Sequence, residues 1–79
     1  MKVIVNVQLK NGVLDPQGKA VHHALGSLGF NGVNDVRIGK QILLDVAGTD
    51  AKTVKEEVTK MCEELLANTV IEDYTIELA

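Results

Sequence analysis

The stretch that determines the fold is Lys2-Val3-Ile4-Val5-Asn6-Val7-Gln8-Leu9, in which every second residue from Val3 is apolar and the polar residues Asn6 and Gln8 fall between them. Successive side chains of a β-strand point to opposite faces, so this period of two predicts a strand with one face on the core. β-branched residues such as valine favour strands as well. We therefore predict a strand over residues 2–9 that ends before the turn-forming pair Asn11-Gly12 and whose inward set is Val3, Val5, Val7 and Leu9.

A helix is predicted from Pro16 to about Leu28. Asp15 can accept hydrogen bonds from the free amides of the first helical turn, and proline suits the first helical position because its missing N–H has no partner there. Gly29 can adopt the positive φ that often ends a helix. The apolar stripe of this helix consists of Ala20, Val21, Ala24, Leu25 and Leu28.

Two further strands are predicted over residues 33–38 and 41–47. Gly39-Lys40 between them fits a two-residue hairpin turn with glycine in the first central place. Within the second of these strands, alternate residues form a clean inward set. Its members are Ile42, Leu44 and Val46.

A second helix is predicted to start at Thr49 or Asp50 and to end near Asn68, and a last strand follows over residues 70–78. Apolar residues recur in the helix at the spacing of one buried face, which is the strongest periodic signal in the chain. They are Val54, Val58, Met61, Cys62 and Leu65.

The predicted order is β-α-β-β-α-β in a single domain over residues 1–79. With right-handed crossovers, this α+β order most simply gives a ferredoxin-like, four-stranded antiparallel sheet with both helices on one face. The second and fourth strands then form the edges, and neither carries a proline or a central lysine to block pairing with another chain. We expect the chain to form at least a dimer through these edges.

Composition narrows the class of function. A domain of 79 residues buries a small core, and such domains commonly rely on oligomerisation, disulfides or metals. A single cysteine excludes an internal disulfide, and a net charge of −3 argues against nucleic acid. No apolar run approaches the 20 or so residues of a membrane span. Without a signal-peptide pattern, we expect a cytoplasmic protein.

Few residues suggest chemistry of their own. Cys62 lies on the apolar stripe with no base beside it, which predicts a buried structural thiol. His22 and His23 are adjacent, a spacing at which the two rings cannot chelate one metal on a helix. Glu72 and Asp73 face opposite sides of a strand. We predict no catalytic residue, no cofactor site and no metal site.

Arg37, Gly39 and Lys40 form the one suggestive cluster. Three interpretations stay open: a solvated hairpin, a polar anchor for a partner protein, or an anion site, the last being weakest. An arginine anchor is chemically reasonable because guanidinium makes planar, directional bonds to carboxylates and carbonyls. Asp15 has a general-acid interpretation too, although helix capping explains it fully.

One longer stretch resembles a known family. The run Lys10-Asn11-Gly12-Val13-Leu14-Asp15-Pro16-Gln17-Gly18-Lys19-Ala20-Val21 resembles the opening signature of PurS, the small subunit of phosphoribosylformylglycinamidine synthase. The resemblance continues through residues 28–30, 36–40, 61–68 and 70–74. Thr69 departs from the proline common there, and residues 47–57 match loosely.

The resemblance implies a non-catalytic accessory subunit in purine biosynthesis. A dimer of such subunits bridges an ATP-dependent synthetase subunit and a glutaminase subunit, and helps ammonia pass between them. The complex uses ATP, Mg and glutamine, none of which this chain is expected to bind. An alternative from another class is a dimeric ferredoxin-like regulatory module that binds a small effector. An acyl-phosphate hydrolase and an RNA-binding domain are weaker alternatives.

We expect five residues to contribute to intersubunit contacts. They are polar or glycine residues near the ends of predicted elements, and folding explains them only in part. These residues are Arg37, Gly39, Lys40, Asp15 and Gln17.

Overall fold

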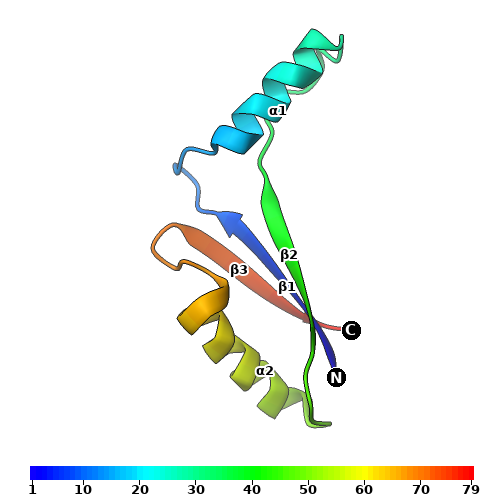
Figure 1. Cartoon of the computed structure of the whole chain (residues 1–79), viewed down its shortest axis with the longest axis vertical. Coiled ribbons are helices and arrows are strands. Elements are labelled where there is room, and N and C mark those ends of the chain that lie inside the picture. The colour runs from blue at the N-terminus through cyan, green and yellow to red at the C-terminus, as the bar shows by residue number, and fades with distance from the viewer.

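A computed structural model describes residues 1–79. It contains three strands, two α-helices and one π-helical turn (Figure 1). In chain order these elements are β1 (Lys2–Leu9), α1 (Pro16–Ser27), β2 (Gly39–Asp45), α2 (Ala51–Met61), η1 (Cys62–Leu66) and β3 (Glu72–Leu78).

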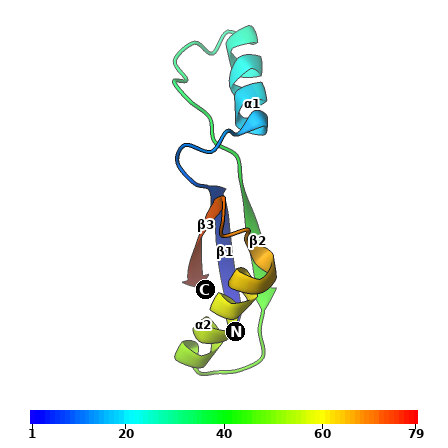
Figure 2. The ribbon, with the colours of Figure 1, turned by 90° about the vertical axis from the view of Figure 1, so that its left-hand side faces the viewer.

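Strand β1 lies at the centre of a three-stranded sheet of order β2-β1-β3, and both pairings are antiparallel. Val5 is opposite Ile42 on one side and Ile76 on the other. The predicted alternation holds for Val3, Val5 and Val7, which are at most 1% exposed, whereas Leu9 is only partly buried and lies outside the core cluster. Helix α2 packs on this face through Val54 and Val58, and η1 adds Cys62, so most of the apolar burial that stabilises the domain occurs between the sheet and this continuous helical segment (Figure 2).

Helix α1 does not pack on the sheet. It projects beyond the end of β1, and the molecule measures 48 × 25 × 14 Å (Figure 1). The expectation of both helices on one face is therefore wrong, because only α2 covers the sheet. As a result Val21 and Leu28, part of the predicted inward stripe of α1, are 40% and 73% exposed.

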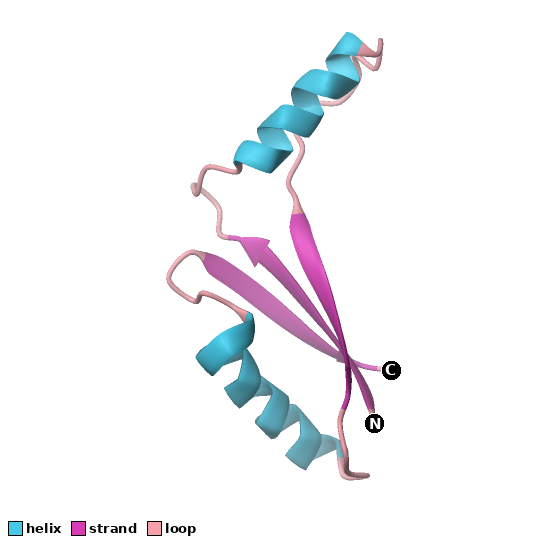
Figure 3. Cartoon of the chain, viewed as in Figure 1, coloured by secondary structure: helices cyan, strands magenta, loops and turns pink.

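The predicted strand over residues 33–38 is absent, and so the four-stranded sheet is wrong (Figure 3). These residues form an extended connection from α1 to the sheet, where the backbone N–H of Ile38 and that of Val36 donate to aspartate side chains instead of a neighbouring strand. Val33, Val36 and Ile38 are partly buried there. Gly39 and Lys40 are not a hairpin turn, because they begin β2 opposite Gln8 and Val7.

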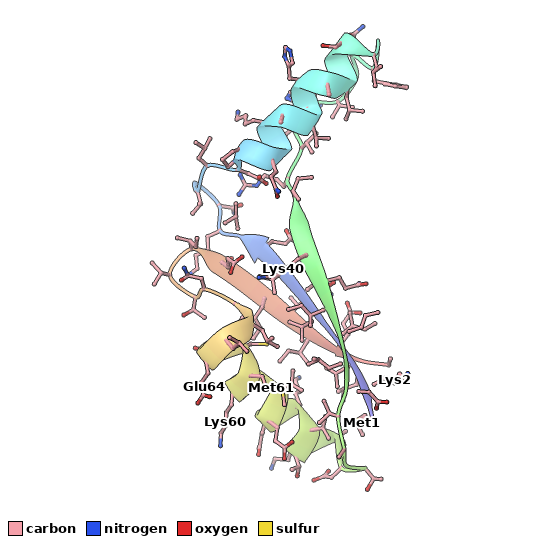
Figure 4. All side chains as sticks on the ribbon, in the orientation of Figure 1. Met1, Lys2, Lys40, Lys60, Met61 and Glu64 are labelled. Atoms are coloured by element: carbon pink, nitrogen blue, oxygen red, sulfur yellow. The ribbon has the colours of Figure 1, made fainter.

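The second helix follows the predicted path but changes pitch. Its α-helical part ends at Met61, and the N–H of Ala67 then donates to the carbonyl of Cys62, five residues earlier, at 3.1 Å. This wider turn keeps Cys62 buried, as predicted, but leaves Leu65 83% exposed. Lys60 and Glu64 lie on the side of the helix away from the sheet (Figure 4). No helix has the length and apolarity needed to cross a membrane.

A candidate functional site at the neck between sheet and first helix

Two chain segments, residues 10–15 and 33–38, join the sheet to the rest of the chain around α1 (Figure 1). We call these two segments the neck, and residues 16–32 the arm. Helix α1 makes no extensive packing contact with another helix or strand. Within one chain, the position of the arm therefore depends on the contacts made in and beside the neck.

Asp15 is the buried polar residue of the neck, with 4% of its surface exposed. One carboxylate oxygen, Oδ1, accepts from the N–H of Gly18 at 2.9 Å and caps α1, as the sequence predicted. The other, Oδ2, accepts from the N–H of Ile38 at 2.7 Å. The N–H groups of Ile38 and Gly18, together with the charge of Arg37, hold the pKa of Asp15 below its usual value. Asp15 is thus an ionised acceptor at neutral pH and a poor general acid.

Arg37 lies on the segment 33–38 and links it to the segment 10–15. Its Nη1 donates to the carbonyl of Val13 at 3.0 Å, and its Nη2 donates to the carbonyl of Lys10 at 3.2 Å. The forked guanidinium can bridge two carbonyls in this way, which the single ammonium of a lysine reproduces poorly. The sequence left open whether Arg37 belongs to a solvated hairpin, anchors a partner protein or binds an anion, and the structure shows two of its hydrogen bonds within its own chain.

Close backbone contacts explain two glycines. A Cβ atom on Gly18 would overlap the carbonyl oxygen of Val36, and one on Gly39 would lie 2.7 Å from the carbonyl oxygen of Val7. His22 adds a further link, because its Nε2 donates to the carbonyl of Val33 at 2.7 Å. The contacts of Gly18 and His22 tie the arm to the segment 33–38, whereas the contact of Gly39 holds the start of β2 against β1.

A cleft of about 330 Å³ opens beside the neck. Four of the five predicted interface residues line it, namely Asp15, Gln17, Gly39 and Lys40, whereas Arg37 lies outside. Lys40 sits towards the neck end of β2 (Figure 4). The cleft is completed by Val7, Leu9, Pro16, Ile38 and Glu72.

The other candidate groups do not converge on one point. Glu72 accepts from the N–H of Asn68 at 2.6 Å, and Asp73 lies 4.0 Å from the ammonium of Lys10. No group of three or more histidine, cysteine, aspartate or glutamate side chains is placed to hold a metal ion.

One contact was missed by the sequence analysis. The hydroxyl of Tyr74 donates to Glu63 at 2.7 Å and ties β3 to η1. This hydrogen bond, with a contribution from burial, raises the pKa of Tyr74 to about 12. The two residues are 11 positions apart in different elements, so no sequence pattern links them.

Comparison with known proteins identifies the family. The family model described as PurS, phosphoribosylformylglycinamidine (FGAM) synthase, matches residues 2–79. The chain belongs to the PurS family. The PurS subunit of this synthase from Bacillus subtilis is 56% identical over 77 residues, which cover 98% of this chain and 90% of the relative. The PurS subunit from Methanocaldococcus jannaschii is 47% identical and covers 98% and 93%.

Solved PurS structures share the fold. Bacillus subtilis PurS matches with a TM-score of 0.83 at 55% identity, covering 96% of this chain and 94% of the other. Methanocaldococcus jannaschii PurS, described as one of the subunits of formylglycinamide ribonucleotide amidotransferase in the purine biosynthetic pathway, matches at 0.86 and 46% identity and covers 96% and 92%. PurLQS from Thermotoga maritima matches at 0.88 and 36% identity and covers 96% and 93%. With 96% of this chain covered, the likeness includes most of the arm.

Proposed function

We propose that this subunit of phosphoribosylformylglycinamidine synthase is a non-catalytic bridge between the ATP-dependent synthetase subunit and the glutaminase subunit of purine biosynthesis. The observation that carries the proposal is the arm, a helix held away from the sheet with apolar side chains uncovered. Phe30 is 60% exposed and Leu28 is 73% exposed. Apolar side chains gathered on a projecting element are typical of an interaction surface. The PurLQS structure supports assembly with partner chains in this family.

The polar groups of the neck support a structural role. Both carboxylate oxygens of Asp15 and two donors of Arg37 are used in hydrogen bonds within the chain. Cys62 is fully buried, and burial raises the pKa of its thiol, which disfavours the nucleophilic thiolate. We therefore assign the binding of ATP, Mg and glutamine to the other subunits. We also propose that the complex is cytoplasmic.

Ammonia transfer gives such a bridge a physical purpose. Ammonia released into bulk water at neutral pH becomes protonated and loses the lone pair that attacks the substrate. A subunit that holds the two active sites together keeps ammonia out of bulk water and provides proximity rather than reactive groups. Surface shape and rigidity are the properties that this task requires.

We also propose that the bridge is a homo-oligomer of at least two copies. Only one helix of the chain covers the sheet. The apolar stripe of the arm is uncovered, and it is the kind of surface with which a second helix would cover a sheet. A second copy related by a two-fold axis can accept this arm and return its own, which is the self-complementary arrangement of most dimers. The free edges of β2 and β3 offer further pairing surfaces.

A reconstitution tests the bridge. The chain is added to the synthetase and glutaminase subunits of the same source, and amidine formation is measured with glutamine and, separately, with ammonium. We expect the chain to restore the glutamine-dependent rate and to leave the ammonium-dependent rate unchanged. No ternary complex and no response of either rate would contradict the proposal and favour the effector-binding alternative.

A further inference from the structure

We infer that Asp15 and Arg37 are positioning residues for the glutamine-dependent reaction, because together they set the angle of the arm relative to the sheet. This inference rests on the proposed bridging function and deepens it. It gives these residues a role that needs no contact with a partner, unlike the intersubunit contacts expected from the sequence.

The two residues form a reciprocal clamp across the neck. Asp15, on the segment that enters the arm, accepts from the N–H of Ile38 at 2.7 Å on the segment that leaves it. Arg37, on the leaving segment, donates back to the carbonyls of Val13 and Lys10 on the entering segment at 3.0 and 3.2 Å. The entering segment contains a turn in which the N–H of Val13 donates to the carbonyl of Lys10 at 3.1 Å, and Arg37 bonds to the carbonyls at both ends of this turn. Bonds that run in both directions between this turn-containing segment and the leaving segment restrict their twisting as well as their separation.

The clamp is coupled directly to the first turn of α1. The carboxylate that binds Ile38 also caps the helix through the N–H of Gly18 at 2.9 Å. Gly18 in turn touches the backbone of Val36 so closely that no side chain fits between them. A change in the twist of the neck therefore moves the start of the helix, and a small rotation there displaces the far end of the arm most.

The clamp is separate from the core that folds the domain. The buried cluster consists of residues of β1, α2, η1 and Ala67, and the side chains packed against it come from Met1, β2, Val46, η1 and β3. No residue of the arm or of the neck belongs to it. Loss of the clamp should consequently change the angle of the arm while the sheet and α2 remain folded.

Three variants test this role. Asp15→Ser retains a good helix-capping oxygen but is too short to reach Ile38 as well. Arg37→Lys keeps the charge and loses the fork. Asp50→Ser is the matched control, because Asp50 precedes α2 and its side chain accepts from the hydroxyl of Thr53 in the first turn of that helix. Circular dichroism of each variant checks that the helices are retained.

The angle is measured as the distance between nitroxide labels at Ser27 and Thr75, two exposed positions on the arm and on β3. Labelled chains are diluted with unlabelled ones so that distances within one chain dominate. We expect a narrow distribution for the wild type and Asp50→Ser, and a broad one for Asp15→Ser and Arg37→Lys. If the distance distributions of both Asp15→Ser and Arg37→Lys match that of the wild type, the two residues do not set the angle of the arm.

The same variants are assayed in the reconstituted complex at saturating concentrations of all subunits. We expect the glutamine-dependent rate to fall on the order of tenfold to a hundredfold in the clamp variants, with the ammonium-dependent rate unchanged. A broadened distribution with a normal glutamine-dependent rate overturns the positioning role. A wild-type chain without effect on either rate overturns the bridging function instead, and the distance measurement still decides the clamp.

Discussion

Gly18 lies so close to Val36 that a Cβ atom on the glycine would overlap the Val36 carbonyl oxygen and approach Asp15 Oδ2 to 2.9 Å. The first turn of α1 thus rests directly on the backbone of the returning segment. Glycine is required here by space, since its φ is not positive. Contacts of this kind, not burial in the main core, hold the arm in place.

Replacing Gly18 by alanine should destabilise the arm even though alanine favours helices. Forcing a methyl group into a filled space costs about 1–3 kcal/mol, whereas the helix propensity of alanine returns about 1 kcal/mol or less. Gly26→Ala is the matched control, because a Cβ there meets nothing within 4 Å. Urea unfolding followed by circular dichroism, with amide exchange of α1, should rank Gly18→Ala below wild type and Gly26→Ala at or above it. Equal stability of the two variants would contradict the contact.

The phenol of Tyr74 should titrate late. Its pKa is raised to about 12 by the hydrogen bond to Glu63, against an ordinary value near 10. Because the folded pKa lies above the unfolded one, the stabilisation is complete below pH 10 and is lost as the pH rises to 12. The chain has a single tyrosine, so absorbance near 295 nm reports this group alone.

Glu63→Gln removes the charged acceptor while keeping a carbonyl oxygen. We expect the ultraviolet midpoint of Tyr74 in this variant to move from about 12 towards 10. The unfolded chain in urea supplies the reference midpoint. A native midpoint near 10 in the unsubstituted chain would exclude the Tyr74–Glu63 bond in solution.

The π-helical turn should make two adjacent leucines respond differently. Leu65 is 83% exposed, so Leu65→Ala should change the free energy of unfolding by less than about 0.5 kcal/mol in the isolated chain. Leu66 packs against the core, so Leu66→Ala should lower it by about 1–3 kcal/mol. Chemical unfolding of both variants measures the difference. Similar losses would indicate an α-helix that places both residues beside the core.

Cys62 should resist thiol reagents in the native protein. Its side chain is fully buried, and burial raises the pKa of the thiol, with a further contribution from the charge of Glu63. Reaction then requires local opening as well as deprotonation. A disulfide-exchange reagent at pH 8 should label the thiol rapidly in urea and slowly without it. Equal rates in the two conditions would show that the thiol is not buried in the native protein.

Much of the fold follows from local pattern. Residues 2–9 alternate because β1 is covered on one face, and Asp15-Pro16 mark the start of α1 because capping is a local interaction. The error over residues 33–38 has a physical origin: Val36 and Ile38 alternate with Arg37 as in a strand, yet their N–H groups bond to aspartates. Alternation indicates an extended chain, and it does not identify the hydrogen-bonding partner.

The candidate site was only partly predictable. Four of the residues that the sequence predicts at an interface, Asp15, Gln17, Gly39 and Lys40, line one cleft, and their contact with a partner stays a prediction. The bonds from Arg37 to Val13 and Lys10 span more than 20 residues, and no local pattern specifies such pairs. The sequence also could not predict that α1 projects away from the sheet. An apolar stripe shows that a helix face is to be covered, but it does not show whether the same chain or another chain covers it.

Isotope partitioning tests the bridging function most directly. The reconstituted complex receives glutamine labelled with ¹⁵N in the amide, together with an excess of unlabelled ammonium, and the amidine product is analysed by mass spectrometry. We predict that the product retains the label when this chain is present and that the label is diluted by ammonium when the chain is omitted or carries Asp15→Ser. Equal dilution with and without the chain would contradict the proposal that this subunit supports the transfer of ammonia between the two active sites.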